Sequence, residues 1–321
     1  MRGFLAVAAL AALAVSPAVT PAQAQTEVAM ISFGGATNLP VWIALDRGMF
    51  EKNGLKVRLD QTAGSKEQMA DLMSGKYQFA TTAYDNIVAH TEGQGSAQYA
   101  NYDLVAIGGV HSGLNSIVGR PEIKTWNDIR GKIAAVDSPK SGYATVLYEI
   151  LEKRGIIRDK DYTIISVGGT GARVDALKKG TAHIAVVSSP QDMQMEKEGF
   201  NILGDAAAAL GEYQGSVYAT RRSYAKENEK TVIAFMKTIQ QAHDVVFTDK
   251  AAAIDMLRKR SKGLSEADLE LMYKRLTGPG GLSRNSDVNK QGVGNVLRLR
   301  GTPGDGSKYM DTSFSQKARA N

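Results

Sequence analysis

A stretch in the first third of the chain recurs in the second third, and this repeat constrains the fold more than any other feature. The letters EKNG at residues 51–54 return as EKRG at residues 152–155. Four more positions return at a constant offset of 105 residues: Gly64, Leu72, Gly75 and Ala80 return as Gly169, Leu177, Gly180 and Ala185. A shared order of this kind predicts two related structural units.

Each copy alternates short apolar stretches with helical patterns. In the first copy we expect strands at residues 28–33, 55–59 and 77–81, and helices at residues 39–52 and 65–74. Asn38 is the expected N-cap of the first helix, and Ser65 with Gln68 forms a capping box for the second. Strands that alternate with helices predict βαβ units and a largely parallel sheet in each half.

Two such units predict an α/β protein with two lobes and a ligand cleft between them. Ligands bind beyond the carboxyl ends of strands in open parallel sheets, and domain interfaces are preferred small-molecule sites. Ser112 and Gly113 follow an apolar strand and mark the expected first crossing, and residues 211–215 mark the return. We therefore expect the first lobe at residues 25–111 and 214–321, including a helical C-terminal part and tail, and the second at residues 112–213.

The first 24 residues have the pattern of a secretory signal peptide. Arg2 precedes an unbroken apolar run at residues 4–15, and Ala22-Gln23-Ala24 is a small-residue cleavage pattern. Twelve apolar residues are too few to cross a bilayer comfortably. We expect cleavage before Gln25 and export to the periplasm. The chain has no cysteine, so an N-terminal lipid anchor and disulfides are excluded.

Composition argues against several classes of function. The net charge of +6 is modest and its Lys and Arg residues are spread along the chain, so nucleic-acid binding is not indicated. The four histidines do not stand at helical metal-ligand spacing, and thiolate metal sites need cysteine. Phosphate-binding, dinucleotide-binding and serine-hydrolase motifs are absent or have the wrong order. We predict no catalytic residue, no metal and no cofactor.

Four stretches carry a family resemblance: LPVWIALDRGMFEKNG at residues 39–54, DIRGKIAA at 128–135, DALKKGTAHIA at 175–185 and YMDTSFSQKA at 309–318. In this order they resemble periplasmic substrate-binding proteins of ABC importers, in particular the group that binds nitrate, taurine, aliphatic sulfonates and thiamine pyrimidines. The resemblance implies a two-lobed type II (Venus-flytrap) fold. It also implies a monomer that delivers a solute to a membrane permease, with the ATPase on separate subunits.

Candidate ligand contacts lie where strands end and helices begin, because glycines there admit a ligand and helix N-termini favour anions. In the first lobe they are Phe33, Gly34, Thr37, Asn38, Gly64, Ser65, Thr82 and Tyr84. At the crossings and in the second lobe they are Ser112, Gly113, Ser138, Lys140, Ser141, Gly169, Thr170, Ser188, Ser189 and Tyr213. The same hydroxyls and Asn38 could equally cap their own helices, and Lys140 could point into solvent.

The ligand and the exact role stay open at this stage. Helix starts and positive charge favour a small anion such as a sulfonate or carboxylate, whereas Tyr84 and Phe33 would suit a flat aromatic or pyrimidine. One alternative role is an enzyme of the thiamine-pyrimidine synthase type. That family has a cysteine-rich motif, which this chain lacks. Another alternative is a sensor component that presents its ligand to a receptor.

Overall fold

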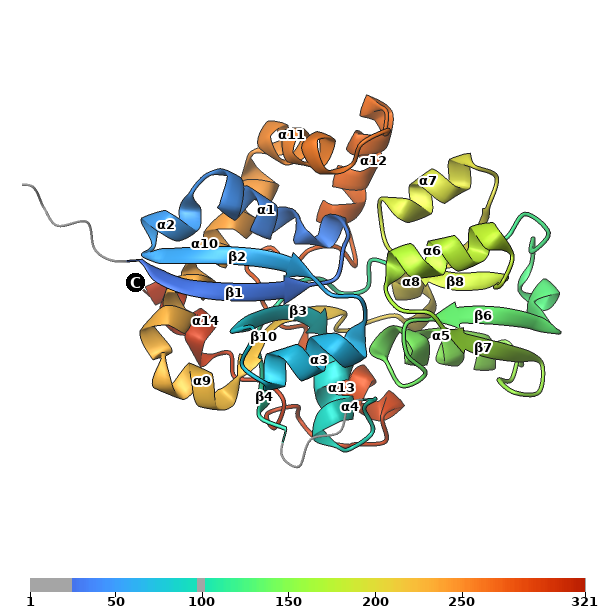
Figure 1. Cartoon of the computed structure of the whole chain (residues 1–321), viewed down its shortest axis with the longest axis horizontal. Coiled ribbons are helices and arrows are strands. Elements are labelled where there is room, and N and C mark those ends of the chain that lie inside the picture. Colours follow the sequence, from blue (N-terminus) through green and yellow to red (C-terminus); the bar gives the residue numbers. More distant parts are fainter. Residues whose placement is uncertain (1–24, 97–101, 321) are drawn as a thin grey trace, which may run out of the picture.

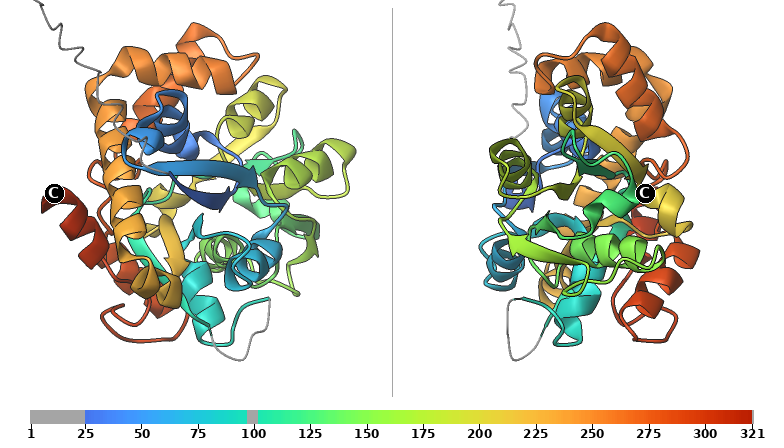
Figure 2. Two further views of the ribbon diagram at one scale, coloured as in Figure 1. Left: turned by 60° about the vertical axis from the view of Figure 1, so that its left-hand side comes forward. Right: turned by 90° about the vertical axis from the view of Figure 1, so that its right-hand side faces the viewer.

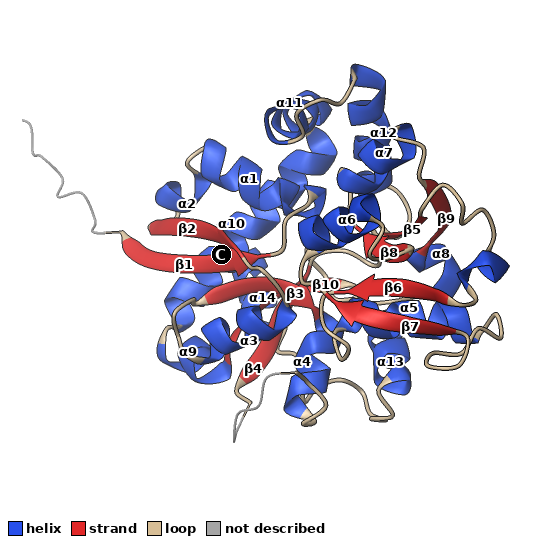
Figure 3. Cartoon of the chain, turned by 45° about the vertical axis from the view of Figure 1, so that its right-hand side comes forward, coloured by secondary structure: helices blue, strands red, loops and turns tan. Residues whose placement is uncertain are grey.

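The computed structural model describes residues 25–96 and 102–320 and folds them into two α/β lobes that lie side by side (Figure 1). Each lobe has one five-stranded sheet with helices packed on it (Figure 3). The expected signal peptide at residues 1–24 lies outside the described residues. None of the helices in the two described ranges has the length and apolarity of a membrane span.

The first lobe combines the start and the end of the chain. Its sheet has the order β2-β1-β3-β10-β4. The strands are β1 (Thr26–Ser32), β2 (Leu55–Gln61), β3 (Phe79–Ala83), β4 (Leu104–Gly109) and β10 (Ser216–Arg221). The helices before the crossing are η1 (Ala36–Asn38), α1 (Leu39–Asp46), α2 (Met49–Lys52), α3 (Ser65–Met73) and α4 (Tyr84–Thr91).

The helices after the return complete this lobe. They are α9 (Arg222–Glu227), α10 (Glu229–Thr248), α11 (Lys250–Arg260), α12 (Glu266–Thr277), α13 (Lys290–Leu299) and α14 (Ser313–Ala320). The long helix α10 packs against both α1 and α14 (Figure 2). Phe235 of α10 stacks on Phe79 of β3 with 3.8 Å between ring centroids, so this helix anchors the C-terminal part to the sheet.

The second lobe is formed by the middle of the chain. Its sheet has the order β7-β6-β8-β5-β9. The strands are β5 (Ser116–Gly119), β6 (Lys132–Val136), β7 (Tyr162–Ser166), β8 (Ile184–Val187) and β9 (Asn201–Asp205). The helices are η2 (Trp126–Ile129), α5 (Gly142–Glu152), α6 (Thr170–Lys179), α7 (Gln191–Lys197) and α8 (Ala206–Leu210).

Two crossing segments, residues 110–115 and 211–215, join the sheets. They explain why each sheet contains both parallel and antiparallel strands. Each segment enters its new sheet from the end of the strands that faces the other lobe, so the strand that follows runs away from that lobe. Accordingly β5 is antiparallel to β8 and β9, and β10 is antiparallel to β3 and β4. The remaining strands of the two repeats, β1 to β3 and β6 to β8, point their carboxyl ends at the opposite lobe (Figure 1).

The sequence repeat corresponds to equivalent positions in the two lobes. Gly75 and Gly180 both follow the helix after the second strand of their copy, and both have positive φ angles, 81° and 75°. Leu72 and Leu177 stand on the inward faces of α3 and α6, and both are fully buried. The matched glycines therefore end matched helices, and the matched leucines fill matched cores.

Two local predictions in the first copy are wrong. The helix expected at residues 39–52 is split into α1 and α2, because the chain turns at Arg47 and Gly48, where φ of Gly48 is 60°. Gly64, not Ser65, occupies the N-cap position of α3, and a glycine has no side chain with which to cap the helix. Gln68 instead donates from Nε2 to the carbonyl of Thr81 at 2.9 Å.

Candidate ligand site between the lobes

The lobes touch through loops that follow the carboxyl ends of their strands. The amide of Ala36 donates to the carbonyl of Ser189 at 2.8 Å, and the amide of Gly169 donates to the carbonyl of Ala63 at 2.7 Å. Both hydrogen bonds join the first lobe to the second. The structure therefore has its lobes closed on one another, with the loops of both copies of the repeat in contact.

On the second lobe, a polar network lies behind these loops. Arg173 donates from Nη2 to Oγ1 of Thr170 at 3.0 Å, and Thr170 lies 3.4 Å from the hydroxyl of Ser188. Ser188 in turn donates to Oδ1 of Asn115 at 2.7 Å. The network thus links the start of α6, the end of β8 and the first crossing segment.

Arg173 carries the positive charge of this network and is 4% exposed. Its Nη1 lies 3.8 Å from the carboxylate of Asp137, a long separation for an ion pair, and its Nε has no hydrogen-bond partner among the described residues. Burial lowers the pKa of the Arg173 guanidinium, and the charge of Asp137 opposes this shift. Asp137 also accepts hydrogen bonds from the Ser141 hydroxyl and, at 3.4 Å, from the amide of Ser65 in the first lobe.

The facing loop of the first lobe is held by its own side chains. Asn38 stands at the expected N-cap position of α1, but its Nδ2 donates to the carbonyls of Phe33 at 2.7 Å and Gly35 at 3.2 Å, so its side chain braces the loop. Thr82 is buried and accepts from Asn86 at 3.1 Å. At the end of β1, the hydroxyl of Ser32 is buried and has no hydrogen-bond partner in residues 25–96 and 102–320.

Part of the candidate set comes together at the lobe contact. The members that contact the other lobe or the Arg173 network are Gly64, Ser65, Ser141, Gly169, Thr170, Ser188 and Ser189. Phe33, Gly34, Thr37 and Asn38 belong to the first-lobe loop that contains Ala36. These eleven positions lie at helix starts and strand ends of both lobes.

Other candidates have different surroundings. Ser112 donates from its amide to the carbonyl of Gly280, and Gly113 donates to Nδ1 of His111, so both brace the first crossing. Lys140 is exposed, in keeping with the alternative in which its side chain points into solvent. The hydroxyl of Ser138 pairs with that of Ser96. Tyr213 is buried in the core, and its hydroxyl has no hydrogen-bond partner in the described part of the chain.

Tyr84 is a clear departure from the expectation that it contacts ligand. Its side chain is fully buried, its hydroxyl donates to the carbonyl of Gly306 at 3.3 Å, and its ring packs edge-on against Tyr309. Helix α4 begins at Tyr84, and this helical start turns the side chain toward the C-terminal tail. Tyr84 therefore fastens the tail to the first lobe.

This position leads to a direct prediction for Tyr84→Phe. The variant loses one buried hydrogen bond, so its free energy of unfolding should fall by about 1 kcal/mol. Its affinity for any solute that stabilises the wild-type protein should change by less than about twofold, since the ring packing stays. Urea unfolding and calorimetric titration measure the two quantities. A tenfold loss of affinity with normal stability would return Tyr84 to the ligand site.

Three residues of the network were not among the sequence candidates: Arg173, Asp137 and Asn115. The repeat does contain a signal for the first of them. Arg173 stands four residues before the buried Leu177, on the same face of α6, and the 105-residue offset matches it to the buried Gln68. A charged residue on an inward helix face is costly unless it is paired, so it marks a candidate site.

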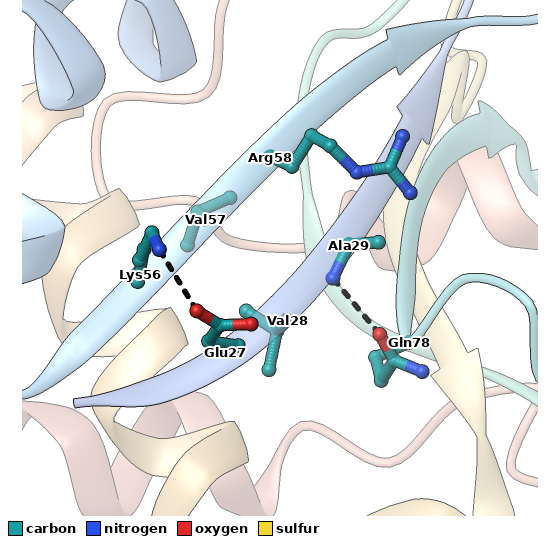
Figure 4. A pocket seen from close by; sticks show the side chains of 7 residues that line it. All are labelled: Glu27, Val28, Ala29, Lys56, Val57, Arg58 and Gln78. Carbon is teal, nitrogen blue, oxygen red and sulfur yellow. Dashed lines mark hydrogen bonds and ion pairs between the residues drawn. The ribbon is translucent and has the colours of Figure 1, made fainter. Parts of the chain in front are cut away.

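A separate hollow of about 570 Å³ lies on β1 and β2 of the first lobe (Figure 4). It is lined by Glu27, Val28, Ala29, Lys56, Val57, Arg58 and Gln78. Glu27 and Lys56 pair with each other at 2.8 Å, with side chains 75% and 65% exposed. Among the described residues, no polar side-chain atom that lines this hollow is buried without a hydrogen-bond partner. The contact between the lobes is therefore the better candidate site.

Two α/β lobes of matching strand order, joined by two crossing segments and closed at their strand ends, define the type II periplasmic binding protein fold. The periplasmic nitrate-binding protein NrtA of Synechocystis PCC 6803 has this fold with a TM-score of 0.74 and 13% identity, over 92% of this chain and 89% of that one. A ligand-binding component of an ABC-type import system from Staphylococcus aureus superposes with a TM-score of 0.74 and 15% identity, over 92% and 99%.

The chain belongs to the family described as "NMT1/THI5 like", which matches residues 36–253. YtlA of Bacillus subtilis (strain 168), named as a candidate binding protein, is 27% identical over 224 residues. This match covers 67% of the present chain and 64% of YtlA. The family assignment and the fold agree with the resemblance carried by the four sequence stretches.

Proposed function

We propose that this protein is the solute-binding component of an ABC-type import system. The observation that carries the proposal is the closed contact between strand-end loops of both lobes, with the amides of Ala36 and Gly169 bonded across it. A solute held there touches both lobes only when they are closed, so its binding energy favours closure. The family and the import component with the same fold support this role.

The finer points of the proposal follow from the sequence. The chain is exported and cleaved before Gln25, and it works in the periplasm as a monomer. The lobes comprise residues 25–111 with 214–321, and residues 112–213. In its closed form the protein docks on a membrane permease, whose ATPase is a separate subunit. The nitrate-binding relative is periplasmic by name, which supports the location.

A thermal-shift screen tests this function on the chain that begins at Gln25. Sulfonates, carboxylates, nitrate, pyrimidines and sugars are each added over a range of concentrations. We expect at least one solute to raise the melting temperature progressively, because a ligand that binds the folded state stabilises it by mass action. If no solute does so, and the purified protein instead converts one of them, the enzyme alternative replaces the proposal.

If the solute is bound by lobe closure, a larger side chain at Gly64 should weaken its binding. A Cβ built on Gly64 lies 3.8 Å from the Cα of Gly168 across the contact, and Gly64 has extended backbone that any residue can adopt. Gly64→Val therefore keeps the first lobe intact but places extra methyl groups against Gly168 when the lobes close. We expect solute affinity to fall at least about tenfold, since overpacking costs roughly 1–3 kcal/mol.

Gly64→Ala is the matched control for that variant. Its Cβ makes an ordinary van der Waals contact at 3.8 Å, so affinity should stay within about threefold of wild type, a difference of under 1 kcal/mol. Calorimetric titration measures both variants, and small-angle scattering reports whether Gly64→Val stays more extended with solute present. Equal affinity for valine and alanine at this position would count against closure through the contact at Gly168.

A further inference from the structure

Arg173 is a buried cation whose hydrogen-bonding capacity is only partly used. A guanidinium has five N–H donors. Nη2 donates to Thr170 at 3.0 Å, Nη1 reaches the carbonyl of Gly168 at 3.5 Å, and Nε has no partner among the described residues. The nearest carboxylate, Asp137, is 3.8 Å from Nη1. A charge removed from water in this way is costly unless another group completes its pairing.

The groups around Arg173 are also suited to hold an anion. The amide nitrogen of Asn115, at the other end of the same network, is buried and has no hydrogen-bond partner among the described residues. The hydroxyl of Thr170 accepts from Arg173 and can donate its own proton to an oxygen, whereas the proton of Ser188 is already donated to Asn115. The N-terminus of α6 adds its partial positive charge at Thr170.

The first lobe closes over this group. A Cβ on Gly35 would lie 3.6 Å from the Cβ of Ser188 and 3.3 Å from the carbonyl oxygen of Ser189. The carbonyl of Ala63 is bonded to the amide of Gly169, next to Thr170. The unpaired donors of the second lobe are therefore shielded from water by backbone of the first lobe when the lobes are closed.

We propose that Arg173 binds the anionic group of the transported solute, and that the solute is a small organic monoanion, a carboxylate or a sulfonate. The carboxylate of Asp137 stands beside the guanidinium, so a second negative charge on the solute would meet repulsion there. This inference rests on the proposed solute-binding function and specifies the ligand class and the residue that recognises it.

Matched pairs of solutes with and without charge test the ligand class. The probes are methanesulfonate, propanoate, benzoate and nicotinate, each against its own amide or sulfonamide. We expect one of the anions, or a larger anion of the same head group found by extending the series, to raise the melting temperature. Its neutral partner should bind at least about 30-fold more weakly, because a charge-assisted hydrogen bond in a buried site is lost.

Two variants on helix α6 test the residue. Arg173→Gln removes the charge and should weaken the best anion at least about 30-fold. Lys179→Gln removes the same charge from an exposed position of the same helix and should leave affinity within about twofold. If Arg173→Gln is too unstable to titrate, Arg173→Lys keeps a charge but loses the planar fork. In that case Arg173→Lys should weaken the binding of the best anion by about tenfold or more.

The outcomes separate the inference from the proposed function. Binding of a neutral solute that is equally tight in wild type and Arg173→Gln keeps the solute-binding function and overturns the anion inference. If Arg173→Gln and Lys179→Gln lose the same affinity for the anion, the effect is one of general electrostatics, and this result also overturns the anion inference. Failure of every charged and neutral solute to stabilise the wild-type protein overturns the function itself.

Discussion

Between pH 6.5 and pH 4 the free energy of unfolding should fall by up to about 7 kcal/mol because two buried histidines resist protonation. Burial lowers the pKa of both His111 and His243 to about 4, from an ordinary value of 6.5. In this interval the unfolded chain binds protons that the folded chain refuses, so stability rises with pH. The contribution is fully present above pH 6.5 and is lost as the pH falls to 4.

The surroundings of the two rings explain why the neutral form is required. Nδ1 of His111 accepts hydrogen bonds from the amides of Gly113 at 3.0 Å and Leu114 at 3.2 Å, so it cannot carry a proton in this arrangement. His111 lies in the first crossing segment, and its protonation would break the turn that joins the lobes. His243 lies in α10 with Nε2 at 2.9 Å from the hydroxyl of Tyr218, surrounded by apolar core.

Urea unfolding at several pH values measures the effect. The double variant His111→Asn and His243→Gln keeps polar side chains but cannot titrate. Its stability should fall with a slope smaller by about 2.7 kcal/mol per pH unit at the steepest point, equal to two protons. His183→Gln is the control: burial also lowers the pKa of this half-buried histidine, so its replacement should change the slope by less than the double variant does. Parallel slopes for the wild type and the double variant would show that carboxylates, not these histidines, set the acid sensitivity.

Much of the fold is encoded locally and could be predicted. The glycines at 75 and 180 stop helices because they adopt positive φ, and the alternation of strands and helices fixes two sheets with facing carboxyl ends. The direction of β5 and β10 was harder to predict, since it depends on where a crossing segment enters the next sheet. The break between α1 and α2 rests on Gly48 alone within an otherwise continuous helical pattern.

The sequence predicted which loops meet at the candidate site better than it predicted which side chains lie there. Helix starts such as Gly64 and Gly169 meet at the lobe contact because the repeat places both at the ends of strands. Tyr84 was misplaced because its partner is Gly306, more than two hundred residues away in the sequence. Pairings over such distances leave no local pattern, and the same holds for Arg300, which contacts the residue next to Tyr84.

The largest effect of a single substitution is expected at Asp85. Its side chain is fully buried, and Arg300 at the end of α13 donates to both of its carboxylate oxygens, from Nε at 2.9 Å and from Nη2. Arg300 is itself 8% exposed in its side chain and also donates to the carbonyl of Lys140 in the second lobe at 2.9 Å. Burial raises the pKa of Asp85, and the charge of Arg300 opposes that shift.

Asp85→Asn leaves the buried Arg300 charge without its counterion, so the free energy of unfolding should fall by about 3–5 kcal/mol. Glu266→Gln is the matched control, because Arg258 also binds Glu266 through two hydrogen bonds, at 2.9 and 2.8 Å, but both side chains are exposed. That control should leave the free energy of unfolding nearly unchanged, because water screens an exposed ion pair. Urea unfolding at pH 7 compares the two.

A double replacement decides whether the loss comes from the stranded charge. Asp85→Leu together with Arg300→Met removes both buried charges and keeps apolar volume, so it should recover most of the stability lost in Asp85→Asn. Recovery would mean that Asp85→Asn is destabilised by the buried guanidinium left without a counterion, and not by loss of the attraction between the two charges. If the double variant is as unstable as the single one, the pair instead holds α4, α13 and the Lys140 loop together through geometry that apolar side chains cannot replace.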